Sequence, residues 1–195
     1  QGRVVKIAFF GAGGVGGLFG GHLADAGCEV AFVARGRHLA ALREHGLTIE
    51  SDAHPHVHVP KVHAVENPAE LGVVDLVVIA VKLWELENAV RAIRPLVGPA
   101  TAVLSLQNGV VKDDRLRAQF GAQAVMGGVA YVGSHLARPG VIRQTGAMQR
   151  VVFGEYDGAR SARAQALLAA FKRTPVEAEL SGDIRRTLWE KYVFL

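Results

Sequence analysis

The chain has 195 residues, a formal net charge of +4 and a hydrophobic fraction of 50%, which suit one α/β domain or one domain with the start of another. Its Lys and Arg residues are scattered and only 7% of its residues are aromatic, so we expect no nucleic-acid partner. We expect no membrane association and no signal peptide, because no apolar run approaches the roughly 20 residues that span a bilayer. Cys28 is the only cysteine, which favours a reducing, cytoplasmic location.

The first predicted elements are a strand at residues 4–10, a glycine-rich turn with the sequence GAGGVG and a helix. In a G-x-G-x-x-G turn, Gly11 permits the sharp bend, Gly13 lets a pyrophosphate approach the backbone, and Gly16 lets the helix pack on the strand. The helix N-terminus adds free N–H groups and a partial positive charge. We therefore expect dinucleotide phosphates to bind at six residues: Gly11, Ala12, Gly13, Gly14, Val15 and Gly16.

The alternative for this turn is a tight strand–helix junction without a ligand. That alternative leaves unexplained why further glycines gather there, namely Gly14, Gly17, Gly20 and Gly21. The helix after the turn is expected to be amphipathic, with these residues on one apolar face: Val15, Leu18, Phe19, His22, Leu23 and Ala26.

The second predicted strand, residues 30–34, ends at Arg35. A Rossmann fold that prefers NAD has Asp or Glu at this place, about 20 residues after the turn, to accept a hydrogen bond from the ribose 2′-hydroxyl. A carboxylate would repel a 2′-phosphate, whereas a guanidinium binds it through paired charge-assisted hydrogen bonds. We therefore expect NADP(H) rather than NAD(H), with Arg35 on the 2′-phosphate. The alternative is a solvated arginine at a strand end.

The rest of the chain alternates between strands and helices. Strands are predicted at 47–51, 57–62, 75–81, 102–106, 124–131, 151–153 and 176–180, and helices at 37–45, 83–94, 112–120, 161–171 and from 183 onward. Residues 133–146 are predicted to be loop-rich, with a turn at Pro139-Gly140. This alternation predicts an α/β fold, a Rossmann-type doubly wound and mostly parallel sheet. Asp113-Asp114 is expected to be the N-cap and first turn of its helix.

The boundary between domains is expected near residue 180. Residues 1–180 would form the NADP-binding Rossmann domain, and residues 181–195 the first part of a helix leading into a helical C-terminal domain. We interpret the chain as a fragment, because it stops at Leu195 inside the apolar helix pattern WEKYVFL. Such a piece would expose apolar surface, so the oligomeric state stays open, with a homodimer of the whole protein as one alternative.

Three imidazoles, His54, His56 and His58, alternate along the chain. On one strand they would share a face and could hold zinc. No carboxylate or cysteine completes the set nearby, so we favour a half-exposed polar strand face and expect no metal site.

Motifs in a fixed order carry a family resemblance. They are the GAGGVG turn, Ala34-Arg35-Gly36 after the second strand, VKLW at 81–84, QNGV at 107–110 and Trp189-Glu190-Lys191. Over essentially its whole length the chain resembles the ketopantoate reductase (2-dehydropantoate 2-reductase) family. No single motif is specific, but their ordered combination is.

The resemblance implies an NADPH-dependent reduction of ketopantoate to pantoate in pantothenate biosynthesis, by hydride transfer to the carbonyl of a small anionic 2-oxo acid. It implies that Lys191 protonates the carbonyl oxygen, that Asn108 contacts cofactor and substrate, and that Lys82 lies near the nicotinamide ribose and the substrate. A lysine suits the role of proton donor because its charge stabilises the developing alkoxide and burial lowers its pKa. Without the resemblance, Lys191 would be interpreted as a solvated helix lysine, Asn108 as part of an Asn-Gly turn, and Lys82 as a charged residue at a strand end.

The chain departs from the family pattern at three places. Leu195 stands where the family has an asparagine that helps to bind the substrate, Glu85 stands where a glutamine often lies near the cofactor, and the helical C-terminal domain is absent. We therefore keep alternatives: a reductase of a different carbonyl substrate, or a non-catalytic NADPH-sensing module with a protein partner. A weaker alternative is a 3-hydroxy-acid or sugar-phosphate dehydrogenase. For the chain alone we expect cofactor binding at best.

Overall fold

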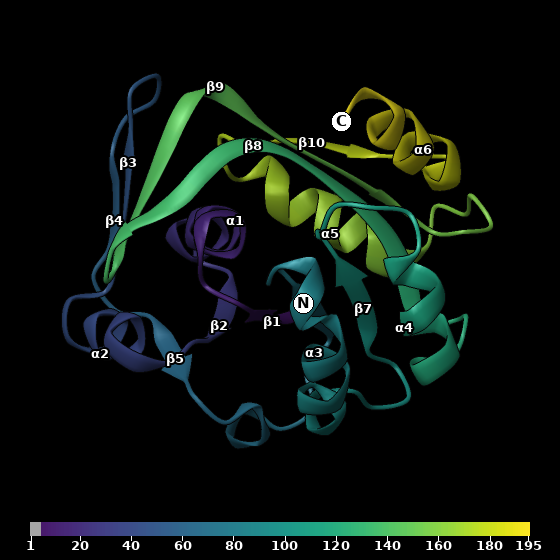
Figure 1. The fold of residues 1–195 in the computed structure, drawn as a ribbon, viewed down its shortest axis with the longest axis horizontal. Coiled ribbons are helices and arrows are strands. Elements are labelled where there is room, and N and C mark those ends of the chain that lie inside the picture. The colour runs from purple at the N-terminus through teal and green to yellow at the C-terminus, as the bar shows by residue number, and fades with distance from the viewer. Residues whose placement is uncertain (1–4) are drawn as a thin grey trace.

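The computed structural model describes residues 5–195, and Figure 1 shows its elements. Six parallel strands form the centre of the sheet, in the spatial order β5, β2, β1, β6, β7, β8. Their bounds are His63–Val65 (β5), Glu29–Val33 (β2), Lys6–Phe10 (β1), Leu76–Ile79 (β6), Ala102–Ser105 (β7) and Val125–Arg138 (β8). Parallel strands in this order, with helical crossovers, are the Rossmann arrangement, so the expected fold class is confirmed. The predicted strand residue Val4 lies outside the described residues.

Helices cover both faces of this sheet. Alternate residues of β1 point to opposite faces, so Ile7 and Phe9 pack in one core and Ala8 and Phe10 in another. The first core contains residues of α1 (Gly14–Asp25), α2 (Gly36–His45) and α5 (Ala162–Lys172), and the second contains residues of α3 (Leu86–Ala92) and α4 (Lys112–Phe120). Figure 1 shows α1 and α5 on one side of β1 and β7 and α3 on the other. The sheet is therefore doubly wound.

A long hairpin replaces the loop expected at residues 133–146, so that expectation is wrong. β8 runs from Val125 to Arg138 and β9 from Val141 to Gly154, paired antiparallel with register shifts at Val132/Gly133 and Leu136/Arg138. The predicted strands 124–131 and 151–153 correspond to parts of β8 and β9, and within residues 133–146 only the turn at Pro139-Gly140 was predicted correctly. Glycines and polar residues hide this hairpin from a propensity argument, and the strands form because β9 also pairs with neighbours along its length.

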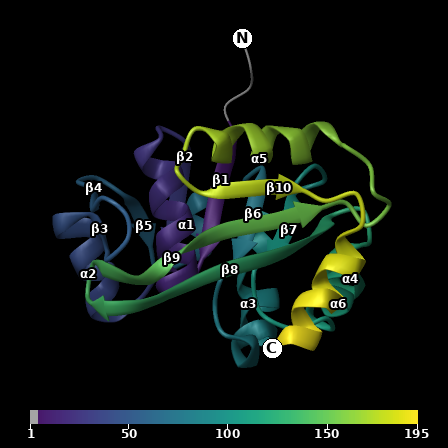
Figure 2. The same ribbon diagram turned by 90° about the horizontal axis from the view of Figure 1, so that it is seen from above.

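These neighbours extend the sheet beyond β9. The N-terminal half of β9 pairs parallel with β3 (Leu47–Ser51), which pairs antiparallel with β4 (Val57–Val59), and its C-terminal half pairs parallel with β10 (Glu177–Leu180). Figure 2 shows β8 and β9 crossing the whole molecule side by side. β4 ends before the predicted residue 62, and His54 and His56 precede it. The strand therefore contains only one of the three histidines, His58. This argues against the alternative in which all three share a strand face and hold zinc.

Helix α1 lies between the central strands and this hairpin. It is therefore buried all round, whereas the sequence analysis predicted burial of one face only. Its residues from Gly16 to Leu23 are all buried. A Cβ on Gly17 would lie 2.7 Å from Ile142 of β9, one on Gly20 would lie 2.5 Å from Phe32, and one on Gly21 would lie 2.8 Å from Leu47. These glycines therefore serve close packing of two layers on α1, which corrects the inference that their accumulation indicates a ligand.

The remaining helical segments are short connectors and a C-terminal helix. Three 3₁₀ turns lie at Pro68–Leu71 (η1), Leu83–Glu85 (η2) and Arg94–Leu96 (η3), so the helix predicted at 83–94 begins and ends as 3₁₀. The N-cap of α4 is Val111 rather than Asp113. α6 (Ile184–Phe194) is capped by Asp183, with the Arg186 N–H 3.1 Å from Oδ1. None of the helices in residues 5–195 combines the length and apolar character that crossing a membrane requires.

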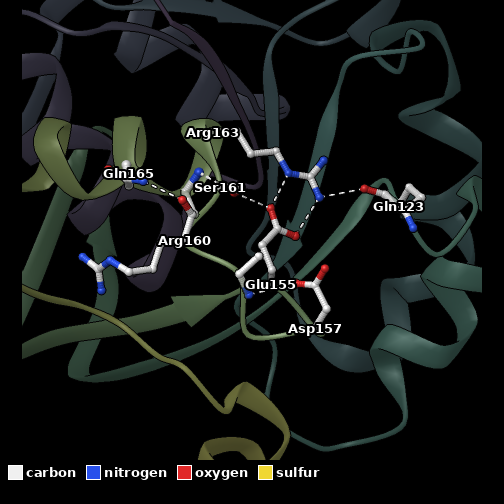
Figure 3. A network of polar contacts seen from close by, with 9 residues as sticks. Gln123, Glu155, Asp157, Arg160, Ser161, Arg163 and Gln165 are labelled. Carbon is white, nitrogen blue, oxygen red and sulfur yellow. Dashed lines mark hydrogen bonds and ion pairs between the residues drawn. The ribbon is translucent and has the colours of Figure 1, made fainter.

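A polar network joins the end of β9 to α5 (Figure 3). The carboxylate of Glu155 accepts hydrogen bonds from Arg163 at 2.6 and 2.8 Å and from the Ser161 hydroxyl at 2.7 Å. Burial alone would raise the pKa of Glu155, but these donors outweigh it and hold the pKa below 4.5. Arg163 also donates to the carbonyl of Gln123 at 2.7 Å, which ties α5 to the loop before β8.

Candidate functional site

An open cleft of about 1180 Å³ lies at the carboxyl ends of the central strands. Gly11 follows β1, Ala34 follows β2, Ala80 follows β6 and Leu106 follows β7, and all four line the cleft. Ligands of open α/β sheets bind at this edge, where the strand order reverses. Here the reversal lies between β1 and β6, directly beside the glycine-rich turn.

The three motif glycines of the turn occupy different surroundings. Gly11 has φ +107°, a conformation that L side chains rarely adopt. A Cβ on Gly16 would lie 2.0 Å from the carbonyl oxygen of Gly11, so α1 can approach β1 only without one. A Cβ on Gly13 would meet nothing within 4 Å, because this residue faces the open cleft. The backbone of Gly13 is thus free for a ligand.

The N-terminus of α1 opens into the cleft beside Gly13. The N-cap residue Gly13 has no side chain that could cap the helix, and no acidic residue lies in the first turn. Free N–H groups and the helix dipole attract an anion at such a position. The turn therefore offers a phosphate site without any competing carboxylate of the helix itself.

Two residues that the sequence did not single out hold this turn in place. His38 of α2 donates from Nε2 to the carbonyl of Ala12 at 2.6 Å and accepts from the Gly140 N–H at Nδ1, at 2.9 Å. Burial lowers the pKa of His38, which favours the neutral ring that this pair of bonds requires. Ser134 of β8 donates to the carbonyl of Gly14 at 2.7 Å. The hairpin is thus a support of the glycine-rich turn.

Arg35 lies at the mouth of the cleft as the N-cap residue of α2. Its side chain is 77% exposed and its Nη2 lies 3.0 Å from Oε1 of Glu85, at the end of η2. The structure therefore brings together the arginine predicted to bind the 2′-phosphate and the glutamate noted as a departure from the family pattern.

Lys191 of α6 points toward the other end of the cleft. Its Nζ donates to Oδ1 of Asn108 at 2.9 Å and to the carbonyl of Ala130 on β8, and it lies 5.2 Å from the centre of the Tyr131 ring. Burial and then the charge of Lys112 lower the pKa of Lys191 below 10.5. A half-buried ammonium with a lowered pKa can release a proton more readily than a solvated lysine.

Lys82 and Leu195 complete the predicted set. Lys82 is exposed on the cleft wall, and its carbonyl accepts a hydrogen bond from Gln107 Nε2 at 3.0 Å. Gln107 also accepts from the Ser105 hydroxyl at 3.1 Å, so it joins the loops after β6 and β7. Leu195 lines the cleft with Lys191, which agrees with the expectation that residues four apart share a helix face.

A buried ion pair lies beneath this end of the cleft, and sequence analysis missed it. Lys112 is 0% exposed, and its Nζ lies 2.8 Å from the Ser105 carbonyl, 3.2 Å from Asp113 Oδ1 and 3.4 Å from the Gly128 carbonyl. The other oxygen of Asp113 accepts from the Tyr156 hydroxyl. Adjacent charges at a helix start indicate a solvated turn, so nothing in the local pattern distinguishes this buried lysine.

The fold and the cleft define the class of Rossmann-type α/β domains, which hold dinucleotides at this edge of the sheet. Comparison with known proteins makes the family specific: the family model for ketopantoate reductase (PanE/ApbA) matches residues 7–158. The chain belongs to the ketopantoate reductase family.

Individual relatives agree with this assignment. YkpB of Bacillus subtilis, described as an uncharacterized oxidoreductase, is 34% identical over 98% of this chain and 62% of its own length. A 2-dehydropantoate 2-reductase of Mesorhizobium japonicum is 34% identical over 96% of this chain and 63% of its own length. The crystal structure of 2-dehydropantoate 2-reductase from Geobacter metallireducens superposes with a TM-score of 0.90 and 34% identity, covering 97% of this chain and 62% of that one.

A structural relative contains a nicotinamide cofactor. D-mandelate dehydrogenase, in a ternary structure with NADH and anilino(oxo)acetate, superposes with a TM-score of 0.83 at 26% identity, over 95% of this chain and 60% of that one. The family is thus one of nicotinamide-dependent oxidoreductases. The chain spans 62% of the length of YkpB.

Proposed function

We propose that the protein containing this chain reduces ketopantoate to pantoate with NADPH. The observation that carries the proposal is the position of Lys191, whose Nζ lies 2.9 Å from Asn108 Oδ1 in the cleft that also contains the glycine-rich turn. A bound nicotinamide supplies a hydride at such a site. The substrate is then a small anionic 2-oxo acid, and the resemblance of the D-mandelate dehydrogenase complex with anilino(oxo)acetate supports that class.

The residues present fit a dinucleotide. Gly13 leaves its side of the cleft open, and the first turn of α1 has no acidic residue, so the six turn residues from Gly11 to Gly16 would hold the pyrophosphate. Arg35 would hold the 2′-phosphate of NADP(H). Lys82 and Asn108, which line the cleft after β6 and β7, would hold the nicotinamide ribose and the substrate.

Lys191 would act as the proton donor. Its ammonium stabilises negative charge on the carbonyl oxygen and transfers its proton to that oxygen as the hydroxyl forms. Asn108 Oδ1 and the Ala130 carbonyl accept hydrogen bonds from Nζ, so they fix the direction of the ammonium. The Lys112 charge disfavours a second buried ammonium and makes the proton easier to release.

We further propose the domain division of the sequence analysis, with residues 1–180 as the NADP-binding domain and 181–195 as the first helix of a helical second domain. Exposed apolar residues of α6 support this: Trp189, Tyr192, Val193 and Phe194 are 52–89% exposed. A cytoplasmic location agrees with the single cysteine, Cys28. Because the proposal includes a second domain, activity should be measured on the complete gene product.

The test is NADPH oxidation by the complete gene product with ketopantoate and a panel of other 2-oxo acids. Turnover of ketopantoate faster than of every other panel member supports the proposal. Faster turnover of another 2-oxo acid would transfer the assignment to that substrate, in line with Leu195 at the cleft wall. NADPH binding without turnover of any 2-oxo acid would favour a cofactor-sensing module.

A pair of glycine variants tests the nucleotide site separately from turnover. Gly13→Ala is expected to leave the melting temperature within about 2 °C but to weaken NADPH binding at least about tenfold, because its methyl group enters the space of the pyrophosphate. Gly16→Ala is expected to destabilise the fold, because its Cβ collides with the Gly11 carbonyl at 2.0 Å. Fluorescence titration with NADPH measures the affinity of each variant, and thermal unfolding measures its melting temperature. Unchanged NADPH affinity in Gly13→Ala would contradict the phosphate site.

A further inference from the structure

The Arg35–Glu85 ion pair crosses the cleft in front of the glycine-rich turn. β1 lies between β2 and β6 in the sheet. Arg35 follows β2 and Glu85 follows β6, and their side chains meet at 3.0 Å. The pair therefore extends across the carboxyl end of β1, where Gly11 begins the turn. Both residues line the cleft, so neither faces away from a bound nucleotide.

We propose that Glu85 is a specificity-determining residue that weakens the preference of this protein for NADPH over NADH. The inference rests on the proposed function, in which Arg35 is the ligand of the 2′-phosphate. In the structure the Glu85 carboxylate already occupies Nη2 of that guanidinium. A 2′-phosphate must displace this carboxylate or share the arginine with it, and in either case two anions meet at one cation. A ribose 2′-hydroxyl carries no charge and meets no such repulsion.

Exposure decides how strong this effect is. The Arg35 side chain is 77% exposed and that of Glu85 is 26% exposed, so the ion pair is a weak surface pair and opens readily. Glu85 therefore does not block the binding of the 2′-phosphate, but it lowers the affinity of the protein for NADPH. Because Glu85 is the more buried partner, its charge is screened less by salt than that of a free surface carboxylate.

The cleft wall carries other charges besides this ion pair. Glu66 lines the cleft and adds a second negative charge, while Lys82 and Lys191 line it after β6 and from α6. Lys191 is held by Asn108 and Ala130 rather than by Glu85. The charge that meets Glu85 directly is that of Arg35, so the preference between the two nucleotides depends on this pair.

The chain offers a matched control in Glu87. This glutamate lies two residues further on, in α3, and pairs with Arg115 of α4 at 2.7 and 2.9 Å. It does not line the cleft. Glu85→Gln and Glu87→Gln therefore remove the same charge from almost the same place in the chain, and only one of them changes the partner of Arg35.

The experiment measures the Kd of NADPH and of NADH for the complete gene product by fluorescence titration. Glu85→Gln is expected to strengthen NADPH binding about three- to tenfold and to leave NADH within about twofold, since a charge a few ångströms from a phosphate is only partly screened. Glu87→Gln should leave both values unchanged. In an Arg35→Gln background, Glu85→Gln should lose its selective gain, because the guanidinium that both anions share is gone.

The outcomes separate this inference from the proposed function. If the unmodified protein binds neither nucleotide, the proposed function fails. If it binds NADPH but the ratio of the two Kd values is the same in Glu85→Gln and in the unmodified protein, the role of Glu85 fails while the proposed function stands. A gain of equal size in Glu87→Gln would also overturn it, because general charge would then explain the effect.

Discussion

Replacing Lys191 with alanine is expected to lower the kcat of ketopantoate reduction by about 10²–10⁴-fold, the range typical for loss of a positioned proton donor. The Kd of NADPH should stay within about threefold, because Lys191 lies at the end of the cleft opposite Arg35 and is held by Asn108 and Ala130. Steady-state turnover and NADPH fluorescence titration on the complete gene product measure the two quantities. Lys172→Ala, an exposed lysine at the end of α5, is the matched control.

The pH dependence of the same reaction follows from the lowered pKa of Lys191. In the proposed mechanism reduction needs the protonated ammonium, so kcat should fall as pH rises through the pKa of Lys191. Burial and the Lys112 charge place that pKa below 10.5, and the fall should therefore begin below pH 10.5. Lys191→Ala should lose this limb of the profile. A variant that kept both the rate and the limb would show that another group donates the proton.

Local sequence signals predicted the cofactor end of the site because each depends on neighbours in the chain. The turn from Gly11 to Gly16 follows a short buried strand and begins a helix, and this order predicts a phosphate site. Arg35 was predicted in the same way, as the residue at the end of β2, and its role stays a prediction. The fold class also followed from the alternation of elements along the chain.

The parts that sequence analysis missed depend on contacts between distant residues. The hairpin of β8 and β9 has few apolar residues over its middle, and it forms because β9 pairs with β3 and β10 as well as with β8. His38 joins Ala12 to Gly140, and Gly140 lies 102 residues beyond His38 in the chain. Such bonds leave no periodic pattern, and the residues that support the glycine-rich turn were hidden for this reason.

The ion pair of Lys112 and Asp113 carries the other large expected effect. The register pairs of β7 and β8 end at Leu104 and Met126, and beyond them the Lys112 ammonium joins the Ser105 carbonyl to that of Gly128. Lys112 therefore holds together the two strands that lead to Asn108 and Ala130, the partners of Lys191. Lys112 lies beneath the cleft and has a structural role, but through these strands it supports the position of Lys191, the proposed proton donor.

Lys112→Met is expected to lower the free energy of unfolding by about 3–5 kcal/mol, because it leaves the buried carboxylate of Asp113 without its cation. The double variant Lys112→Met, Asp113→Asn should recover most of this loss, since a neutral amide oxygen still accepts from the Tyr156 hydroxyl. Equilibrium denaturation in urea at pH 7 measures both. A loss below about 1 kcal/mol in the single variant would contradict a charged pair. Methionine fills the volume of the lysine stem, so the single variant leaves little cavity. Recovery of stability in the double variant would therefore show that the cost lies in the uncompensated charge of Asp113.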